Sequence, residues 1–128
     1  KMVVKGMVKK RWGRIINISS AVAKMGNAGQ TNYAASKAAI EGLTVTLAAE
    51  FAPNIRINCV APSLTNSKIA QSMLKNPIVA EALAKAHPLK RVGEGKDSAA
   101  LAKFLLTEES SWVTGQVIGV DGGRSSLS

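Results

Sequence analysis

A long alanine-rich segment between two apolar runs constrains the fold of this chain most. From about Thr31 to Phe51, apolar residues recur at helical spacing, which predicts one helix of about that extent. The runs on either side, Arg14–Ser19 and Ile55–Ala61, are rich in β-branched residues and bounded by turn residues, which predicts two strands. A strand, a helix and a second strand in this order favour a parallel sheet with a helical crossover.

Other segments continue the alternation of strands and helices. Arg14–Ser19 is almost continuously apolar, which predicts a strand buried on both faces. Asp97 or Ser98 is the predicted cap of a helix that ends near Thr107. Further helices are predicted over residues 2–10, 67–74 and 77–86, and a short strand over 116–120. The predicted fold class is therefore α/β, with about three parallel strands and flanking helices.

Composition narrows the class of protein. A length of 128 residues is typical of a single domain. The composition, 46% apolar and 20% charged residues, argues against disorder. The single cysteine, Cys59, cannot form an internal disulfide, which fits a reducing compartment, and we expect a cytoplasmic protein. No long apolar stretch follows the Lys-rich start, so we expect neither a signal peptide nor a membrane partner.

The net charge of +9 raises the question of nucleic acid. Six of the 17 basic residues lie in the first 14 positions: Lys1, Lys5, Lys9, Lys10, Arg11 and Arg14. These positions carry no recognition motif, so we expect a solvated helix face and no nucleic-acid partner. A basic face of this kind also suits an acidic partner, such as a carrier protein or a phosphorylated cofactor.

Three side chains form a candidate catalytic group. Tyr33 and Lys37 are four residues apart on the predicted helix, so the phenol and the ammonium lie on one face. A cation beside a phenol stabilises the phenolate, which suits Tyr33 to acid–base work. Ser20 follows the first predicted strand, where a glycine-containing loop allows it to return over Tyr33. The group has no hydride donor of its own, so it suits a reaction in which a cofactor carries out the redox step.

These residues resemble the catalytic signature of the short-chain dehydrogenase/reductase family. The resemblance rests on Ser20, Tyr33 and Lys37 within Ile-Ile-Asn-Ile-Ser-Ser and Asn-Tyr-Ala-Ala-Ser-Lys-Ala. The sequence of Met25–Tyr33 is similar to that of the 3-oxoacyl-[acyl-carrier-protein] reductase branch. The resemblance implies an NAD(P)-dependent oxidoreductase that interconverts a ketone or 3-oxoacyl group and a secondary alcohol. It also implies a small carbonyl, alcohol or acyl-carrier substrate and a homo-oligomer.

The resemblance implies roles for single residues. Tyr33 would be the general acid or base, Lys37 would hold the nicotinamide ribose, and Ser20 would orient the substrate oxygen. The cofactor, NAD or NADP, would be bound by Tyr33, Lys37, Pro62, Ser63 and Thr65. The family's Pro-Gly after the sixth strand is Pro62-Ser63 here, which is a mild departure.

A larger departure concerns the first half of the family's domain. The glycine-rich phosphate loop and the asparagine of the family's catalytic tetrad do not occur in these 128 residues. We therefore expect residues 1–128 to be a single partial domain, the second half of a Rossmann-like, doubly wound parallel sheet. The alternative is a non-catalytic half-domain or an oligomerisation fragment. In either case we expect the 128 residues alone to be inactive.

His87, the only histidine, is a further candidate residue. It has no Cys or acidic cluster near it in the sequence, so we expect no metal site. A hydrolase-like pairing of His87 with Ser20 remains open from the residues alone, although the Gly-x-Ser-x-Gly motif is absent.

Overall fold

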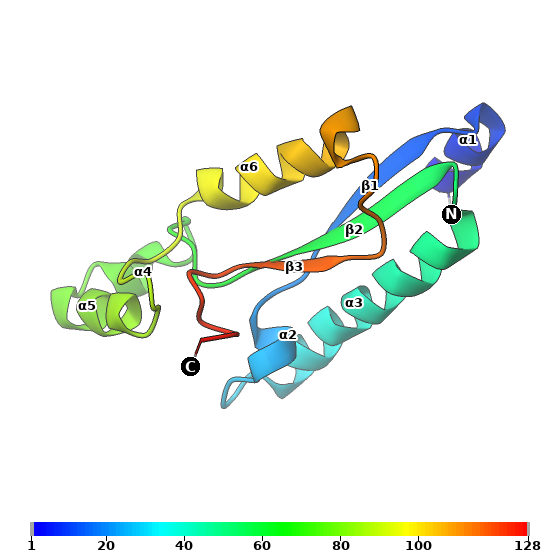
Figure 1. Cartoon of the computed structure of the whole chain (residues 1–128). Coiled ribbons are helices and arrows are strands. Elements are labelled where there is room, and N and C mark those ends of the chain that lie inside the picture. Colours follow the sequence, from blue (N-terminus) through cyan, green and yellow to red (C-terminus); the bar gives the residue numbers. More distant parts are fainter. Residues whose placement is uncertain (1, 128) are drawn as a thin grey trace.

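Three parallel strands form the sheet in the computed structural model, which describes residues 2–127 and the side chains of residues 3–127. β1 (Gly13–Ile18) pairs with β2 (Ile55–Pro62), and β2 pairs with β3 (Val117–Val120). Figure 1 shows α3 (Thr31–Phe51) across one face of the sheet and α6 (Gly95–Leu106) across the other. The predicted α/β class is confirmed.

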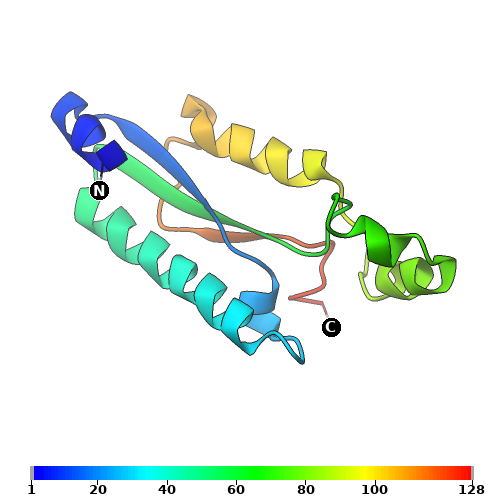
Figure 2. The same cartoon turned by 180° about the vertical axis from the view of Figure 1, so that it is seen from behind.

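The remaining elements lie at the ends of the sheet. They are α1 (Met2–Lys10), α2 (Val22–Met25), α4 (Gln71–Leu74), α5 (Pro77–Lys85) and the 3-10 turn η1 (Glu108–Ser110). Seen from behind in Figure 2, α4 and α5 project beyond the carboxyl end of β2. Among the described residues, no helix is long and apolar enough to cross a membrane. Lys1, which belongs to the basic cluster in the sequence, lies outside the described residues.

Two predicted helix starts differ from the structure. The helix predicted from residue 67 begins at Gln71, because Ser67 accepts hydrogen bonds in a preceding turn from the main chain of Ala70 and Gln71. α6 begins at Gly95 and is capped by Glu94, so the predicted cap at Asp97 or Ser98 was wrong. Asp97 instead closes a capping box by accepting a 2.7 Å hydrogen bond from the Glu94 N–H.

The hydrophobic core lies where α3 and α1 meet the start of the sheet. Ala48, Ile55 and Ile57 are at most 3% exposed and form its centre. Partly buried apolar side chains pack around them: Val4, Met7, Ile15, Leu47 and Phe51. Gly13 is needed at the start of β1, because a Cβ there would lie 2.6 Å from the Met7 sulfur.

β1 is less buried than its sequence predicts. Most of its residues are partly exposed, and Ile18 is 49% exposed. Within the described sheet, β1 is an edge strand that pairs only with β2. The prediction that β1 is buried on both faces was therefore wrong for this structure. β1 is only partly buried, because no described strand or helix covers its outer edge.

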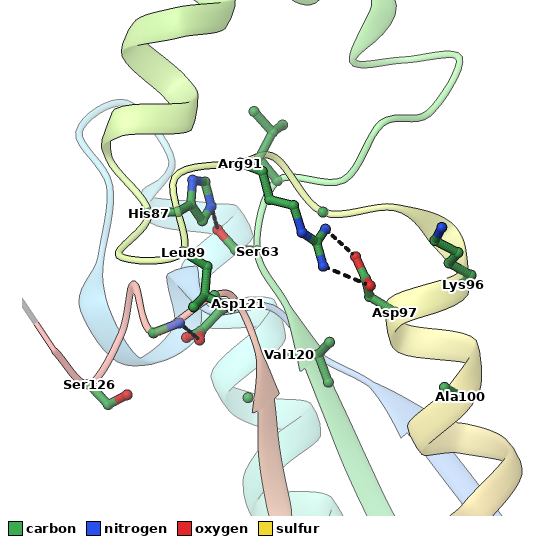
Figure 3. A pocket seen from close by; sticks show the side chains of 15 residues that line it. Ser63, His87, Leu89, Arg91, Lys96, Asp97, Ala100, Val120, Asp121 and Ser126 are labelled. Atoms are coloured by element: carbon green, nitrogen blue, oxygen red, sulfur yellow. Dashed lines mark hydrogen bonds and ion pairs between the residues drawn. The ribbon is translucent and has the colours of Figure 1, made fainter.

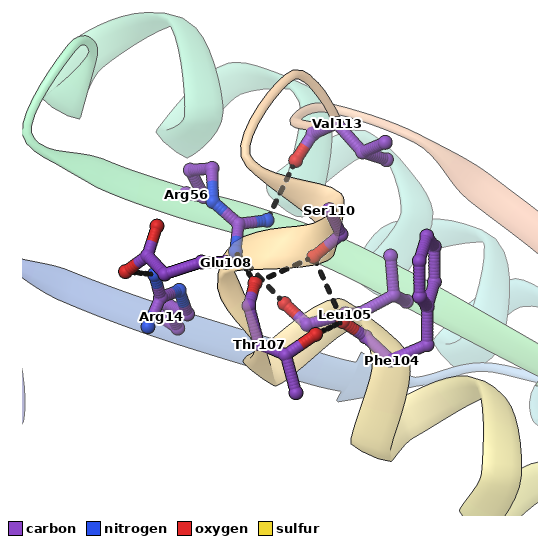
Figure 4. Close-up of polar contacts among 8 residues, drawn as sticks. All are labelled: Arg14, Arg56, Phe104, Leu105, Thr107, Glu108, Ser110 and Val113. Carbon is purple, nitrogen blue, oxygen red and sulfur yellow. Dashed lines mark hydrogen bonds and ion pairs between the residues drawn. The ribbon is translucent and has the colours of Figure 1, made fainter.

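An arginine on β2 joins the end of α6 to the sheet (Figure 4). The Arg56 guanidinium donates hydrogen bonds of 3.0–3.1 Å to three main-chain oxygens, those of Leu105, Thr107 and Val113. Arg14 on β1 forms an ion pair with Glu108 of η1. Burial and the neighbouring Arg14 cation lower the pKa of Arg56. The two arginines together fix the segment after α6 against β1 and β2.

Candidate active site

Ser20 lies just beyond the carboxyl end of β1, on a segment that stays bonded to β2. The Ser19 N–H donates to Val60 O at 2.9 Å, and the Ala21 N–H donates to Pro62 O at 2.8 Å. Ser20 is 7% exposed, and its hydroxyl oxygen accepts a 3.3 Å hydrogen bond from the Val22 N–H at the start of α2. The strand ends therefore hold Ser20 beside the loop that begins at Pro62.

Tyr33 and Lys37 lie on the first turns of α3. The Lys37 ammonium nitrogen is 5.7 Å from the centre of the Tyr33 ring, so the two side chains are neighbours. The same nitrogen donates a 3.1 Å hydrogen bond to the main-chain oxygen of Ile18, at the end of β1. The Tyr33 side chain is 43% exposed and borders a hollow of about 490 Å³ formed with residues 29–32. The phenol is thus open to a ligand and lies close to a cation.

Ser19, the residue after β1, adds a side-chain link to α3. Its hydroxyl lies 2.8 Å from Glu41 Oε1 and 3.1 Å from Lys37 O. Among the described residues, Ser20 has no hydrogen bond to Tyr33 or to Lys37. The structure therefore brings the predicted trio to the same sheet end through Ser19 and the main chain, a link that the sequence does not reveal.

A buried polar layer lies beneath this sheet end. The Asn17 side chain on β1 donates a 2.9 Å hydrogen bond to Thr44 Oγ1 on α3. The Thr44 hydroxyl in turn donates to Ile40 O at 2.8 Å. Cys59 on β2 is fully buried near this layer, and burial raises the pKa of its thiol. Polar contacts below the candidate site thus fix the distance between α3 and the sheet.

The predicted cofactor loop, Pro62–Thr65, follows β2 and is tied to two neighbouring segments. The Ser63 N–H donates to Val120 O at 3.3 Å, at the end of β3. The Thr65 hydroxyl donates to Ser63 O at 3.0 Å, and Thr65 pairs with Gly93 in an isolated parallel bridge. The loop is therefore held at both of its ends by main-chain hydrogen bonds.

His87 is a residue of this site whose partner could not be inferred from the sequence. Its Nε2 lies 2.9 Å from the Ser63 hydroxyl (Figure 3). Its Nδ1 lies 2.8 Å from Leu83 O. The pairing of His87 with Ser20, left open above, does not occur, because both ring nitrogens are already bonded elsewhere. The only signal in the sequence is the serine that stands in place of the family's glycine at position 63.

A hollow of about 780 Å³ opens beside Ser63 and His87, between β3 and the start of α6. Asp121 lies at its floor and accepts hydrogen bonds from the Gly123 N–H at 2.9 Å and the Ser125 N–H at 3.0 Å. Burial acts to raise the pKa of Asp121, but hydrogen bonds from the side chain and main chain of Ser125 and from the Gly123 N–H outweigh it and lower the pKa. Among residues 2–127, no group of three His, Cys, Asp or Glu side chains is placed to hold a metal ion.

Comparison with known proteins identifies the family. The family model described as enoyl-(acyl carrier protein) reductase matches residues 1–125. The chain belongs to the short-chain dehydrogenase/reductase family. The chain is 47% identical over 123 residues to the 3-oxoacyl-[acyl-carrier-protein] reductase FabG of Thermotoga maritima, covering 95% of this chain and 49% of that protein. It is 44% identical over 122 residues to nodulation protein G of a Rhizobium species, covering 94% of this chain and 49% of that protein.

Solved structures of this family share the fold. A gluconate 5-dehydrogenase from Burkholderia cenocepacia, in complex with NADP and tartrate, superposes with a TM-score of 0.92 at 30% identity over 98% of this chain and 50% of that chain. A 3-oxoacyl-[acyl-carrier protein] reductase from Brucella melitensis gives a TM-score of 0.89 at 38% identity over 95% of this chain and 46% of that chain. The Rossmann-like fold is confirmed. The chain spans about half the length of the relatives it matches.

Proposed function

We propose that the whole protein containing this chain is an NAD(P)-dependent oxidoreductase that interconverts a ketone or 3-oxoacyl group and a secondary alcohol. One observation carries the proposal: the Lys37 ammonium lies 5.7 Å from the Tyr33 ring while bonded to the strand end that leads into Ser20. A phenol beside a cation, next to a serine, is suited to moving a proton at a carbonyl or alcohol oxygen. Membership of the short-chain family supports the same chemistry.

Each residue has a distinct role in this proposal. The Tyr33 hydroxyl donates a proton to the substrate oxygen during reduction and takes it back during oxidation. The Lys37 ammonium stabilises the phenolate that Tyr33 becomes after donation. The Ser20 hydroxyl, held at the strand end, orients the substrate oxygen toward Tyr33.

The residues present fit a nicotinamide cofactor, which supplies the hydride when it is bound. Within residues 3–127, the Lys37 ammonium donates to one acceptor, Ile18 O, so two of its three N–H groups remain for a ribose. We assign cofactor binding to Tyr33 and Lys37 and to the loop residues Pro62, Ser63 and Thr65. We propose NAD or NADP, and assays should therefore include both.

We further propose a 3-oxoacyl or acyl-carrier substrate, because several relatives are named 3-oxoacyl-[acyl-carrier-protein] reductase. The outer surface of α3 leaves Leu43 and Val45 more than half exposed, which supports contact with a second copy of the protein. The buried, unpaired Cys59 fits a reducing compartment, and we propose the cytoplasm.

A second candidate function, a non-catalytic half-domain, is favoured by the open edge of β1. In this case residues 1–128 are the second half of a Rossmann-like domain and act through a partner that covers β1. The 128-residue chain assayed alone should show no turnover with NADH or NADPH under either candidate. Turnover by the whole protein separates the two.

Tyr33→Phe in the whole protein tests the catalytic proposal. Removing the hydroxyl removes the proton donor, so kcat for reduction of a 3-oxoacyl substrate should fall by about 10²–10⁴-fold. Ser36→Ala is the matched control, because its hydroxyl is exposed and, among the described side chains, bonds only to Tyr33 O within the same helix. Both variants should keep the wild-type midpoint of thermal unfolding. Activity that persists in Tyr33→Phe would rule out Tyr33 as the acid or base.

A further inference from the structure

A buried histidine connects the loop after β2 to the end of α5. His87 is 1% exposed and both of its ring nitrogens have partners. Nδ1 lies 2.8 Å from a carbonyl oxygen, Leu83 O, which can only accept, so Nδ1 carries the proton. In the neutral ring Nε2 is then the acceptor, and the Ser63 hydroxyl donates to it at 2.9 Å.

A third group supports the serine from the other side. Arg124 Nη1 lies 3.4 Å from Ser63 Oγ and points a donor at its free lone pairs. The main-chain N–H of Leu89 donates to Gly122 O at 3.2 Å, which ties the segment after His87 to the turn after β3. Ser63 is thus the point where the loop after β2, the end of α5 and the turn after β3 are joined. Figure 3 shows its bond to His87.

The geometry points to His87 as a positioning residue: it orients Ser63 and, through it, the Pro62–Thr65 loop. This inference rests on the proposed function, in which that loop holds the nicotinamide cofactor. The ring of His87 is buried, so it does not touch the cofactor itself. Its role is to keep the loop in one conformation, so that the cofactor is bound in the orientation that the reaction needs.

The link also gives the loop a mechanical connection to α5. Leu83 belongs to α5, and His87 follows directly after that helix. A shift of α5 therefore moves His87, and the hydrogen bond to Ser63 passes the shift on to the cofactor loop. Glycine at position 63 has no side chain and cannot make this connection.

Paired substitutions in the whole protein test the role. His87→Leu keeps the volume but removes both ring nitrogens, whereas His87→Gln keeps a donor and an acceptor. Loss of the buried hydrogen bond to Ser63 predicts a fall of about tenfold in kcat/KM for the cofactor in His87→Leu, with recovery of most of it in His87→Gln. Ser63→Ala should lose a similar factor.

The double variant gives the decisive readout. If Ser63 and His87 act as a pair, His87→Leu combined with Ser63→Ala should lose no more than either single variant. Multiplicative losses would overturn the inference. A uniform drop in stability without a change in the kcat/KM of folded protein would also overturn it, because it would make the pair merely structural.

One comparison separates this inference from the proposed function. If the wild-type protein turns over and Tyr33→Phe abolishes turnover, the proposed function stands, and unchanged kinetics in His87→Leu then overturn only the positioning role. If the wild-type protein shows no turnover with NADH or NADPH on any carbonyl substrate tried, the proposed function fails and the positioning role fails with it.

Discussion

The ammonium nitrogen of Lys37 lies 3.1 Å from the main-chain oxygen of Ile18, the last residue of β1. In return, the Ser19 hydroxyl lies 3.1 Å from the main-chain oxygen of Lys37 and 2.8 Å from Glu41 Oε1. Consecutive residues of the strand end thus hold the side chain and the main chain of the same lysine. This arrangement fixes Tyr33 and Lys37 relative to Ser20 without a direct contact between the serine and the tyrosine.

Ser19→Ala should therefore weaken both the fold and the site. Ser19 is only 3% exposed, and the loss of its hydroxyl leaves the Glu41 carboxylate without this donor. We therefore expect a destabilisation of about 1–2 kcal/mol. The urea midpoint measured by circular dichroism checks the effect. Ser36→Ala, on the exposed side of α3, should change the free energy of unfolding by less than about 0.5 kcal/mol. Equal effects of the two substitutions would argue against the link between strand and helix.

Arg56→Met should cost more, because one guanidinium serves three main-chain oxygens. Met keeps much of the side-chain volume but leaves the oxygens of Leu105, Thr107 and Val113 without their donor. We expect a loss of about 3 kcal/mol or more in the free energy of unfolding. Lys103→Met on the exposed surface of α6 is the control and should be close to neutral. A near-neutral Arg56→Met would mean that water replaces the guanidinium at these oxygens.

The sequence predicts the elements well where local pattern decides them. α3, α5 and β2 begin at the predicted residues. Helical spacing indicates α3, a proline in the first turn indicates α5 and a run of β-branched residues indicates β2, and all three are local signals. The four-residue α2 was not predicted, since Val22–Met25 carries no periodic pattern of its own. The exposure of β1 was also not predicted. An apolar run indicates that a strand is suited to burial, but it does not show which neighbouring elements are present to bury it.

The candidate site is predictable only in part for a similar reason. The spacing of Tyr33 and Lys37 reaches across one helical turn and is visible in the sequence. The bond between Ser63 and His87 joins residues 24 positions apart, and the bond between Ser19 and Glu41 joins residues 22 apart. Such pairs depend on how α3 and α5 pack, and neither residue type alone indicates its partner.

Asp97 should make stability depend on pH in the acid range. The bidentate hydrogen bonds from Arg91, and then the Glu94 N–H, lower the pKa of Asp97 from 3.8 to about 2. Because the folded pKa lies below the unfolded one, the contribution is fully present above about pH 4 and is lost as the pH falls toward 2. In urea titrations at steps between pH 5 and pH 2, Asp97→Asn should show a flatter dependence than the wild type. Arg91→Met should reduce the same slope, and an unchanged slope in both would contradict this assignment.

Cys59 should be unreactive in the folded protein. Its side chain is fully buried on β2, and burial raises the pKa of the thiol, so both access and the thiolate form are suppressed. In the native protein, iodoacetamide at pH 8 should therefore label Cys59 only as fast as the protein unfolds locally or globally. In 8 M urea, labelling should be complete within minutes. Mass spectrometry of the peptide that contains Cys59 measures both rates. Ile57→Ala, which opens a cavity in the neighbouring core, should destabilise the protein by about 3 kcal/mol and speed labelling roughly 100-fold. Native labelling at the rate seen in urea would mean that the thiol is open to solvent and that β2 is not the centre of the sheet.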